Sequence, residues 1–180
     1  DGVHLNEGTD GRNLKDGHGG RAEIKSDQLE VDAAGLWFYF SVPAGPLKKI
    51  RIADLLDTIK SDAELAEHVR VVAEIPSIGG TCIDTLDNIF LADAEHGCIT
   101  VLAPDGRRAI LTSDPRMISP DTLFIDNSRR LWIPCSQIQE LGMFNGGQNA
   151  TRAPFLVLSM PLPERCGAIA LGSAGGGISR

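Results

Sequence analysis

Two aspartates, Asp27 and Asp121, have a residue type and a spacing that could support chemistry. Three short apolar segments of the chain each end in an aspartate, at Asp32, Asp84 and Asp126. Five positions before these stand Asp27, Gly79 and Asp121. Equivalent points of a repeat lie at the same end of the fold, so we expect these two carboxylates and the bare backbone of Gly79 to face one channel mouth. Turn aspartates instead bond nearby backbone, and this alternative stays open for Asp27 and Asp121. We expect the three closing aspartates to be turn residues.

Polar residues beside these positions are candidate ligand contacts. Gln28, Thr81 and Thr122 could donate hydrogen bonds to a ligand, or they could satisfy neighbouring sheets. A long loop from 137 to 153 could fold over the site, because function concentrates in long loops, or its glycine turn could simply shape a corner. The candidate ligand-binding residues are therefore Asp27, Gln28, Thr81, Thr122, Gln137 and Asn145.

The elements that position these residues form a repeat. A short turn and a strongly apolar run follow each closing aspartate, over 36–40, 89–92 and 131–134. Repeats at intervals of about 40 to 50 residues, with several short strands in each, are typical of propeller blades. The sequence thus predicts an all-β protein, part of a β-propeller with about three blades near 26–60, 79–113 and 120–160.

The middle unit shows a blade most clearly. Strands are predicted over 82–83, 89–92, 98–102 and 108–112, and Pro104-Asp105-Gly106 between the last two is a strong turn signal. The apolar runs are nearly continuous, as expected for strands buried on both faces. Four aromatic residues in such runs are expected in the core: Trp37, Tyr39, Phe40 and Trp132.

A helical insertion is predicted over 53–70. Leu55 and Ile59 recur at helical spacing, and Ser61 with Glu64 has the form of a capping box. We expect this insertion between the first two blades. The chain ends differ in composition: 1–25 indicates a poorly ordered segment, and the glycine-rich 164–180 indicates a flexible tail.

Composition and cysteine spacing exclude several classes. The formal net charge of −7 and a pI near 5.0 do not favour nucleic acid or an anionic membrane surface. No apolar run is long enough for a spanning helix. Cys82 and Cys98 are placed on the first and third strands of one sheet, too far apart for a disulfide, so we expect buried thiols. Without a C-x-x-C pair a zinc site is not favoured, and the signatures G-x-S-x-G, H-E-x-x-H and the P-loop are missing.

Several motifs together carry a resemblance to a known family. Their order and spacing over about 26–162 resemble microbial members of the major royal jelly protein/yellow family, in Ser26–Val31, Leu36–Phe40, Ala44–Leu47, Ser61–Leu65, Gly79–Thr81, Asp114–Arg116, Pro120-Asp121 and Phe144–Gly147. The resemblance implies the C-terminal half of a six-bladed propeller, related in architecture to the gluconolactonase and strictosidine synthase groups. Ser119 and Gly79-Gly80 depart from the family pattern, which has an aromatic residue and an Asp-Gly-like pair there.

The resemblance also implies a function. It favours a secreted protein that binds a small molecule at the channel mouth. The alternative is a lactone or ester hydrolase of gluconolactonase type that uses Ca²⁺ or another divalent cation, with Asp121 matching that group's metal-binding aspartate. No signal peptide opens the sequence, and the Asn149 sequon matters only in a secreted protein. Further N-terminal blades or self-association would close the propeller, because a half propeller leaves two blade faces bare.

Overall fold

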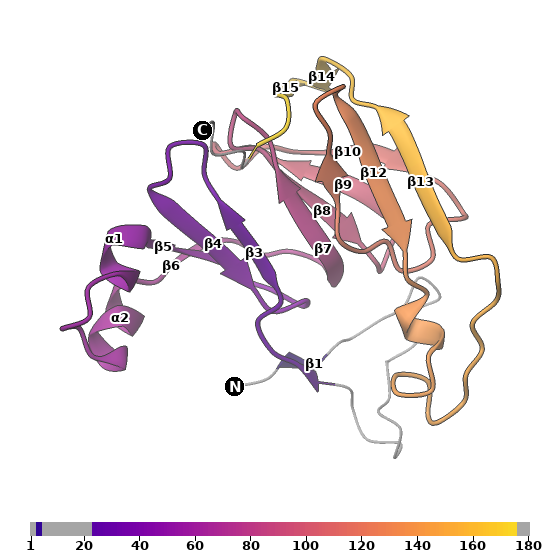
Figure 1. Ribbon diagram of the computed structural model, residues 1–180, viewed down its shortest axis with the longest axis horizontal. Coiled ribbons are helices and arrows are strands. Elements are labelled where there is room, and N and C mark those ends of the chain that lie inside the picture. Colours follow the sequence, from indigo (N-terminus) through magenta and orange to yellow (C-terminus); the bar gives the residue numbers. More distant parts are fainter. Residues whose placement is uncertain (1–2, 5–22, 176–180) are drawn as a thin grey trace.

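The computed structural model describes residues 3–4 and 23–175. Three antiparallel sheets stand side by side, each a meander whose strand order follows the sequence (Figure 1). The first sheet contains β3 (Gln28–Val31), β4 (Trp37–Ser41), β5 (Leu47–Arg51) and β6 (Arg70–Ala73). The second contains β7 (Ile78–Ile83), β8 (Ile89–Asp93), β9 (Cys98–Leu102) and β10 (Arg108–Ser113). The third contains β11 (Phe124–Ile125), β12 (Arg130–Cys135) and β13 (Leu156–Pro161).

The first strands of the three sheets are neighbours. β7 lies against β3 on one side and against β11 on the other, so the sheets are arranged as consecutive blades. The predicted all-β architecture and partial propeller are confirmed, with short helices at α1 (Ile52–Leu55), α2 (Asp62–His68) and the 3₁₀ turn η1 (Ile138–Glu140). No helix in the described part of the chain is long and apolar enough to cross a bilayer.

The closing aspartates hold the turn between the first and second strands of each blade. The Oδ1 atom of Asp32 accepts hydrogen bonds from the backbone N–H groups of Leu36 and Trp37, at 2.7 and 2.9 Å. Asp84 and Asp126 each accept two backbone N–H groups in the same way. Their prediction as turn residues is confirmed, and this shared device explains why the repeat is visible in the sequence.

The core lies between the sheets. One apolar cluster joins the first and second sheets, and a larger one joins the second and third. Phe90, Leu91 and Ala92 of β8 are all 0% exposed, because both faces of the second sheet are covered. This burial explains the nearly continuous apolar runs in its strands.

Each outer sheet has one bare apolar face. On the first sheet this face carries Leu29 and Val31, and on the third it carries Phe124, Trp132 and Val157. Of the four aromatic residues expected in the core, Tyr39 is buried and Trp37 and Phe40 are partly buried. The expectation is wrong for Trp132, which is 37% exposed because no further sheet covers it.

The helical insertion lies inside the first blade. The structure has helices over Ile52–Leu55 and Asp62–His68, one residue wider at the start than the predicted range 53–70, and Ser61 and Glu64 form the capping box. The placement between two blades is wrong, because β6 follows α2 and pairs with β5 as the fourth strand of the first sheet. The insertion is thus a long connection from the third strand to the fourth.

Each end of the chain contributes a pair of short strands. Within 164–175 the predicted flexible tail is wrong, since β14 (Arg165–Cys166) pairs with β15 (Ile169–Ala170) and contacts β10. Cys166, Ile169 and Leu171 are buried in the core there. Positions 176–180, and 1–2 and 5–22 of the predicted N-terminal segment, lie outside the described residues. Next to them β1 (Val3–His4) pairs with β2 (Glu23–Ile24).

The cysteines are buried thiols. Cys82 lies on β7 and Cys98 on β9, and β8 separates these two strands, as the sequence predicts. All four cysteines are free and buried, which confirms the prediction of buried thiols for this pair.

Candidate functional site

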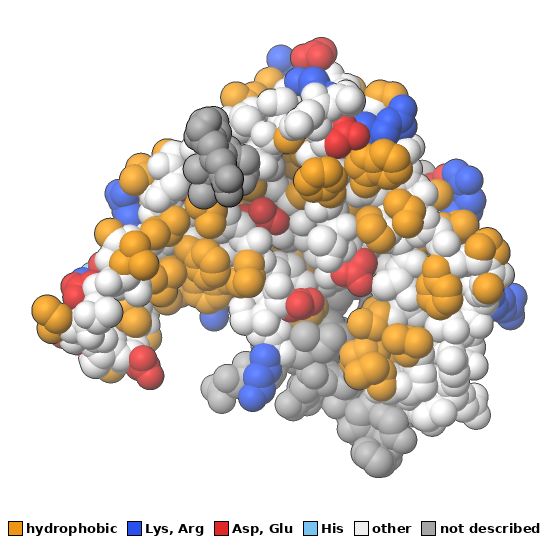
Figure 2. Space-filling view, in the orientation of Figure 1, with side chains coloured by type: hydrophobic (Ala, Val, Ile, Leu, Met, Phe, Trp, Pro, Cys, Tyr) orange, Lys and Arg blue, Asp and Glu red, His pale blue; other side chains and the backbone are white. Residues whose placement is uncertain are grey.

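A groove of about 500 Å³ runs along the first strands of the three blades. Figure 2 shows acidic side chains near the middle of this face of the molecule, with hydrophobic side chains around them. The structure brings five of the seven candidate site residues into the lining of this groove: Asp27, Gln28, Thr81, Asp121 and Thr122. Apolar side chains, among them Phe38 and Phe124, line it as well.

Gly79 and Gly80 allow the second blade to approach the third at this groove. A Cβ atom on Gly79 would overlap the carbonyl oxygen of Pro120, and one on Gly80 would lie 2.6 Å from the backbone nitrogen of Thr122. The glycine at the position equivalent to Asp27 and Asp121 therefore has a packing reason. It brings the segment that carries Asp121 close to β7.

Asp27 and Asp121 face the groove from different blades. Burial raises the pKa of Asp27, and the negative charge of Asp121 raises it further. Each carboxylate also has a local contact. The backbone N–H of Thr122 donates to Oδ1 of Asp121 at 2.8 Å, and Nε2 of Gln28 donates to Oδ2 of Asp27 at 3.2 Å. Local bonding thus uses one oxygen of each, and both carboxylates still line the groove.

Gln28 and Thr81 join neighbouring blades. The side chain of Gln28 donates to the carbonyl oxygen of Gly79 at 3.4 Å and accepts from Ser41 Oγ at 3.2 Å. The hydroxyl of Thr81 donates to Oε1 of Glu30 at 2.6 Å. These contacts favour the structural interpretation of Gln28 and Thr81, although both still line the groove.

Glu30 is a groove residue that the sequence reasoning missed. It is half-buried on β3, and burial raises its pKa while the hydrogen bond from Thr81 lowers it. The signal is the alternation in β3, where the polar Gln28 and Glu30 alternate with the apolar Leu29 and Val31. Two polar residues on one face of an otherwise apolar strand mark the face that bonds the next blade beside the groove.

Gln137 and Asn145 lie outside the groove lining. Gln137 bonds the opposite side of its own loop, donating to Arg152 O at 2.8 Å and accepting from Arg152 N at 2.9 Å. The side chain of Asn145 donates to Gln148 O at 2.9 Å. Gln137 lines a different hollow of about 410 Å³, together with Arg116 and Arg152. The loop contacts seen here fit the corner-shaping alternative.

The groove offers a partial set of metal ligands. Within the described residues no group of three or more His, Cys, Asp or Glu side chains is placed to hold a metal ion. Two carboxylates, Asp27 and Asp121, supply only a minority of the six to eight oxygen atoms that surround Ca²⁺. A cation between them would need the remaining oxygens from water, from a ligand or from another part of the channel.

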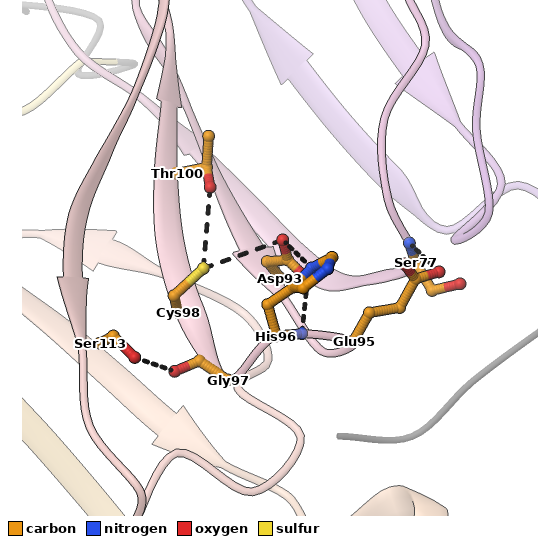
Figure 3. Close-up of polar contacts among 8 residues, drawn as sticks. All are labelled: Ser77, Asp93, Glu95, His96, Gly97, Cys98, Thr100 and Ser113. Atoms are coloured by element: carbon orange, nitrogen blue, oxygen red, sulfur yellow. Dashed lines mark hydrogen bonds and ion pairs between the residues drawn. The ribbon is translucent and has the colours of Figure 1, made fainter. Parts of the chain in front are cut away.

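A second cluster of reactive residue types has a structural role. Figure 3 shows Asp93 between His96 and Cys98, at the turn from β8 to β9. Asp93 accepts from the backbone N–H of His96 at 3.0 Å and contacts its ring Nδ1 at 2.9 Å. Burial and the charge of Asp93 raise the pKa of the Cys98 thiol. A nucleophilic cysteine needs a lowered pKa, so this cluster holds the turn instead.

Comparisons with known proteins identify the fold. No family model and no curated protein matches the chain. Among solved structures, the chain is similar to the crystal structure of regucalcin, a calcium-binding protein from Agrobacterium tumefaciens, with a TM-score of 0.53. The two share 14% sequence identity, and the match covers 90% of this chain and 53% of that one. The likeness shows the β-propeller fold alone, and the chain spans about half the length of that relative.

Proposed function

We propose that this chain forms part of a β-propeller that binds a divalent cation between Asp27 and Asp121 and a small oxygen-bearing molecule beside it. The observation that carries the proposal is the pair of carboxylates from different blades in one groove, where the charge of Asp121 raises the pKa of Asp27. A cation between them removes that repulsion. The description of regucalcin as calcium-binding supports the choice of Ca²⁺.

The groove lining favours a ligand with both polar and apolar parts. Asp27 and Asp121 hold the cation, whose chemistry is to attract the ligand's oxygen atoms. The exposed Thr122 hydroxyl is positioned to hydrogen-bond the same molecule. Phe38 and Phe124 supply apolar surface for its carbon skeleton. Apolar walls with a few polar groups are the usual composition of small-molecule sites.

Calcium titration tests the cation site. We expect isothermal titration calorimetry to show saturable binding of Ca²⁺, and Asp27→Asn or Asp121→Asn to weaken it by about tenfold, since each removes a charged ligand. Asp105→Asn is the matched control, because it removes the same charge from the exposed turn between β9 and β10. The proposal fails if neither Ca²⁺ nor Mg²⁺ binds, or if the control weakens binding as much as the site variants do.

Hydrolysis of a lactone or ester is the second candidate. Its support is the resemblance of the sequence motifs to a family related in architecture to the gluconolactonase group, together with a carboxyl group of raised pKa, Asp27, in the groove. A bound cation would polarise the carbonyl group. Asp121 would hold that cation, and Asp27 would accept the proton of the attacking water. Lactone hydrolysis that survives both removal of divalent ions and Asp121→Ala would eliminate this mechanism.

We also propose a family for the chain and a way in which its propeller closes. The motif order supports a microbial, secreted member of the major royal jelly protein/yellow family. The bare faces of the first and third sheets support closure of the ring by further blades, in the same polypeptide or in a second copy. Sedimentation velocity over a range of concentrations separates these two: a concentration-dependent dimer favours a second copy, and a monomer throughout favours further blades in one polypeptide.

A further inference from the structure

Three cationic side chains surround Trp37 on the first sheet. Lys49 Nζ lies 4.5 Å from the indole centroid, Arg51 Cζ lies 4.4 Å from it and Arg70 Cζ lies 5.5 Å from it. The strand register brings them together, because Trp37 on β4 is opposite Arg51 on β5, and Lys49 on β5 is opposite Arg70 on β6. All four residues therefore share one face of the sheet.

This arrangement is electrostatically costly. Like charges directly opposite each other on neighbouring strands destabilise a sheet, and Lys49 and Arg70 form such a pair. Contacts with the Trp37 ring offset only part of that repulsion, since three cations share it. Within the described residues none of the three cations forms an ion pair, although the chain carries an excess of acidic residues. Violations of local rules of this kind are expected at functional or strained sites.

A hollow beside this cluster has room for a small anion. Its volume is about 270 Å³, and it lies between the sheet and the two helices of the insertion, lined by Trp37, Arg51, Asp54, Glu67, His68 and Arg70. Figure 1 shows α1 and α2 beside the outer strands of this sheet. No residue of this lining belongs to the groove at the first strands, so the two sites are separate.

The two acidic residues of the hollow differ in their partners. Asp54 is compensated, with Lys60 Nζ at 3.3 Å and His68 Nδ1 at 2.9 Å. Glu67 has no ion pair within the described residues, so it is the one carboxylate of the lining whose charge opposes an incoming anion. The two lining cations, Arg51 and Arg70, outnumber it. Lys49 adds a third positive charge outside the lining, over the Trp37 ring, so the charge around the hollow favours an anion.

We propose that this hollow binds a small oxyanion, such as the phosphate, sulfate or carboxylate group of a soluble molecule. Arg51 and Arg70 present planar guanidinium groups that match two oxygen atoms of such an anion. Lys49 adds a third positive charge, and Trp37 forms the apolar wall against which the cations are held. An anion held by Arg51 and Arg70 offsets the repulsion of these two arginines from each other and from Lys49.

Trp37 makes binding directly measurable. The chain has two tryptophans, and Trp132→Phe leaves Trp37 as the only one. Titration of this variant with inorganic phosphate, at constant ionic strength, is expected to change the Trp37 emission in a saturable way. Parallel titrations with sulfate and acetate show which oxyanion group the hollow prefers, and a saturable response to any one of the three supports the site.

Substitutions in the same background separate a built site from general electrostatics. Arg51→Gln and Arg70→Gln are expected to weaken binding by about tenfold each, the effect of losing a charged hydrogen bond. Glu67→Gln is expected to strengthen it by about threefold, because it removes the opposing charge. Lys48→Gln is the matched control: it makes the same charge change on the same strand, but Lys48 is opposite Phe40 on the other face.

Two outcomes would overturn the proposal. One is a Trp37 emission that responds to none of the three anions beyond the effect of ionic strength. The other is a Lys48→Gln variant that loses as much affinity as Arg51→Gln, which would show that only the overall charge matters. Circular dichroism of each variant confirms that the sheet is intact, and all the substituted side chains are at the surface or only partly buried.

Discussion

The second sheet and the two outer sheets have the same meander order but different surroundings. Phe90 in the second sheet is 0% exposed, whereas Leu29 in the first is 56% exposed and Phe124 in the third is 61% exposed. The same repeat unit is therefore core when sheets cover both faces and surface when one face is bare. The comparison teaches that burial in this fold comes from neighbouring blades, because a single twisted sheet cannot bury its own faces.

The largest expected effect comes from comparing two phenylalanines, Phe90 in the covered second sheet and Phe124 on the bare face of the third. Phe90→Ala should lower the free energy of unfolding by about 3–5 kcal/mol, because it leaves a cavity between two sheets. Phe124→Ala should lower it by less than about 1 kcal/mol, since Phe124 lies on a bare face. Urea denaturation of both variants measures the difference.

Equal losses for these two variants would show that Phe124 is covered in solution. That result would contradict the difference between covered and bare sheets, and it would indicate a partner on the third sheet. If Phe90→Ala does not fold, Phe90→Leu tests the same order with a smaller cavity, because it conserves most of the side-chain volume.

The next largest effect comes from comparing Asp84 and Asp126, which hold equivalent turns in the second and third blades. Asp84 is 0% exposed and accepts four hydrogen bonds, from Leu86, from the backbone and side chain of Asn88, and from Gly172 N–H at 2.7 Å. Asp84→Ala should cost about 3 kcal/mol or more, since it leaves buried donors without an acceptor. Asp126→Ala should cost clearly less, because water reaches its donors. Thermal and urea unfolding give the comparison, and a larger loss for Asp126→Ala would contradict it.

The difference between the covered second sheet and the partly bare outer sheets also explains how much of the fold the sequence predicts. The strands of the second blade were predicted closely because burial on both faces makes them apolar runs, and the turn aspartates mark each blade. Strand β6 was missed because Arg70–Ala73 directly follows a helix, and its pairing with β5 spans the whole insertion. The segment 164–175 was misjudged because its glycines suggest flexibility, while its apolar residues are buried only through contacts distant in sequence.

The residues of the candidate site also fall into those that the sequence repeat predicts and those that it does not. Asp27 and Asp121 follow from the repeat, since equivalent positions of the first and third blades meet at one groove. Gln137 and Asn145 did not follow, because their hydrogen bonds close a loop whose path no local pattern encodes. The cations around Trp37 were also missed, since cross-strand register brings them together and register is not visible in a single strand.

The smallest effect concerns pH and contrasts a contact between blades with a turn at the surface. Glu30 accepts a hydrogen bond from Thr81 across the first and second sheets, and burial raises the pKa of this carboxyl group. Hydrogen bonds from the Trp132 side chain and from nearby backbone lower the pKa of Asp126. Ionised Glu30 therefore costs stability above its raised pKa, and the cost disappears as the pH falls through it. Asp126 instead adds stability that is lost as the pH falls. Glu30→Gln should raise the free energy of unfolding at neutral pH and Asp126→Asn should lower it, with both differences vanishing in acid. Urea denaturation at neutral and acidic pH measures this, and a Glu30→Gln variant less stable than the parent at neutral pH would contradict the prediction.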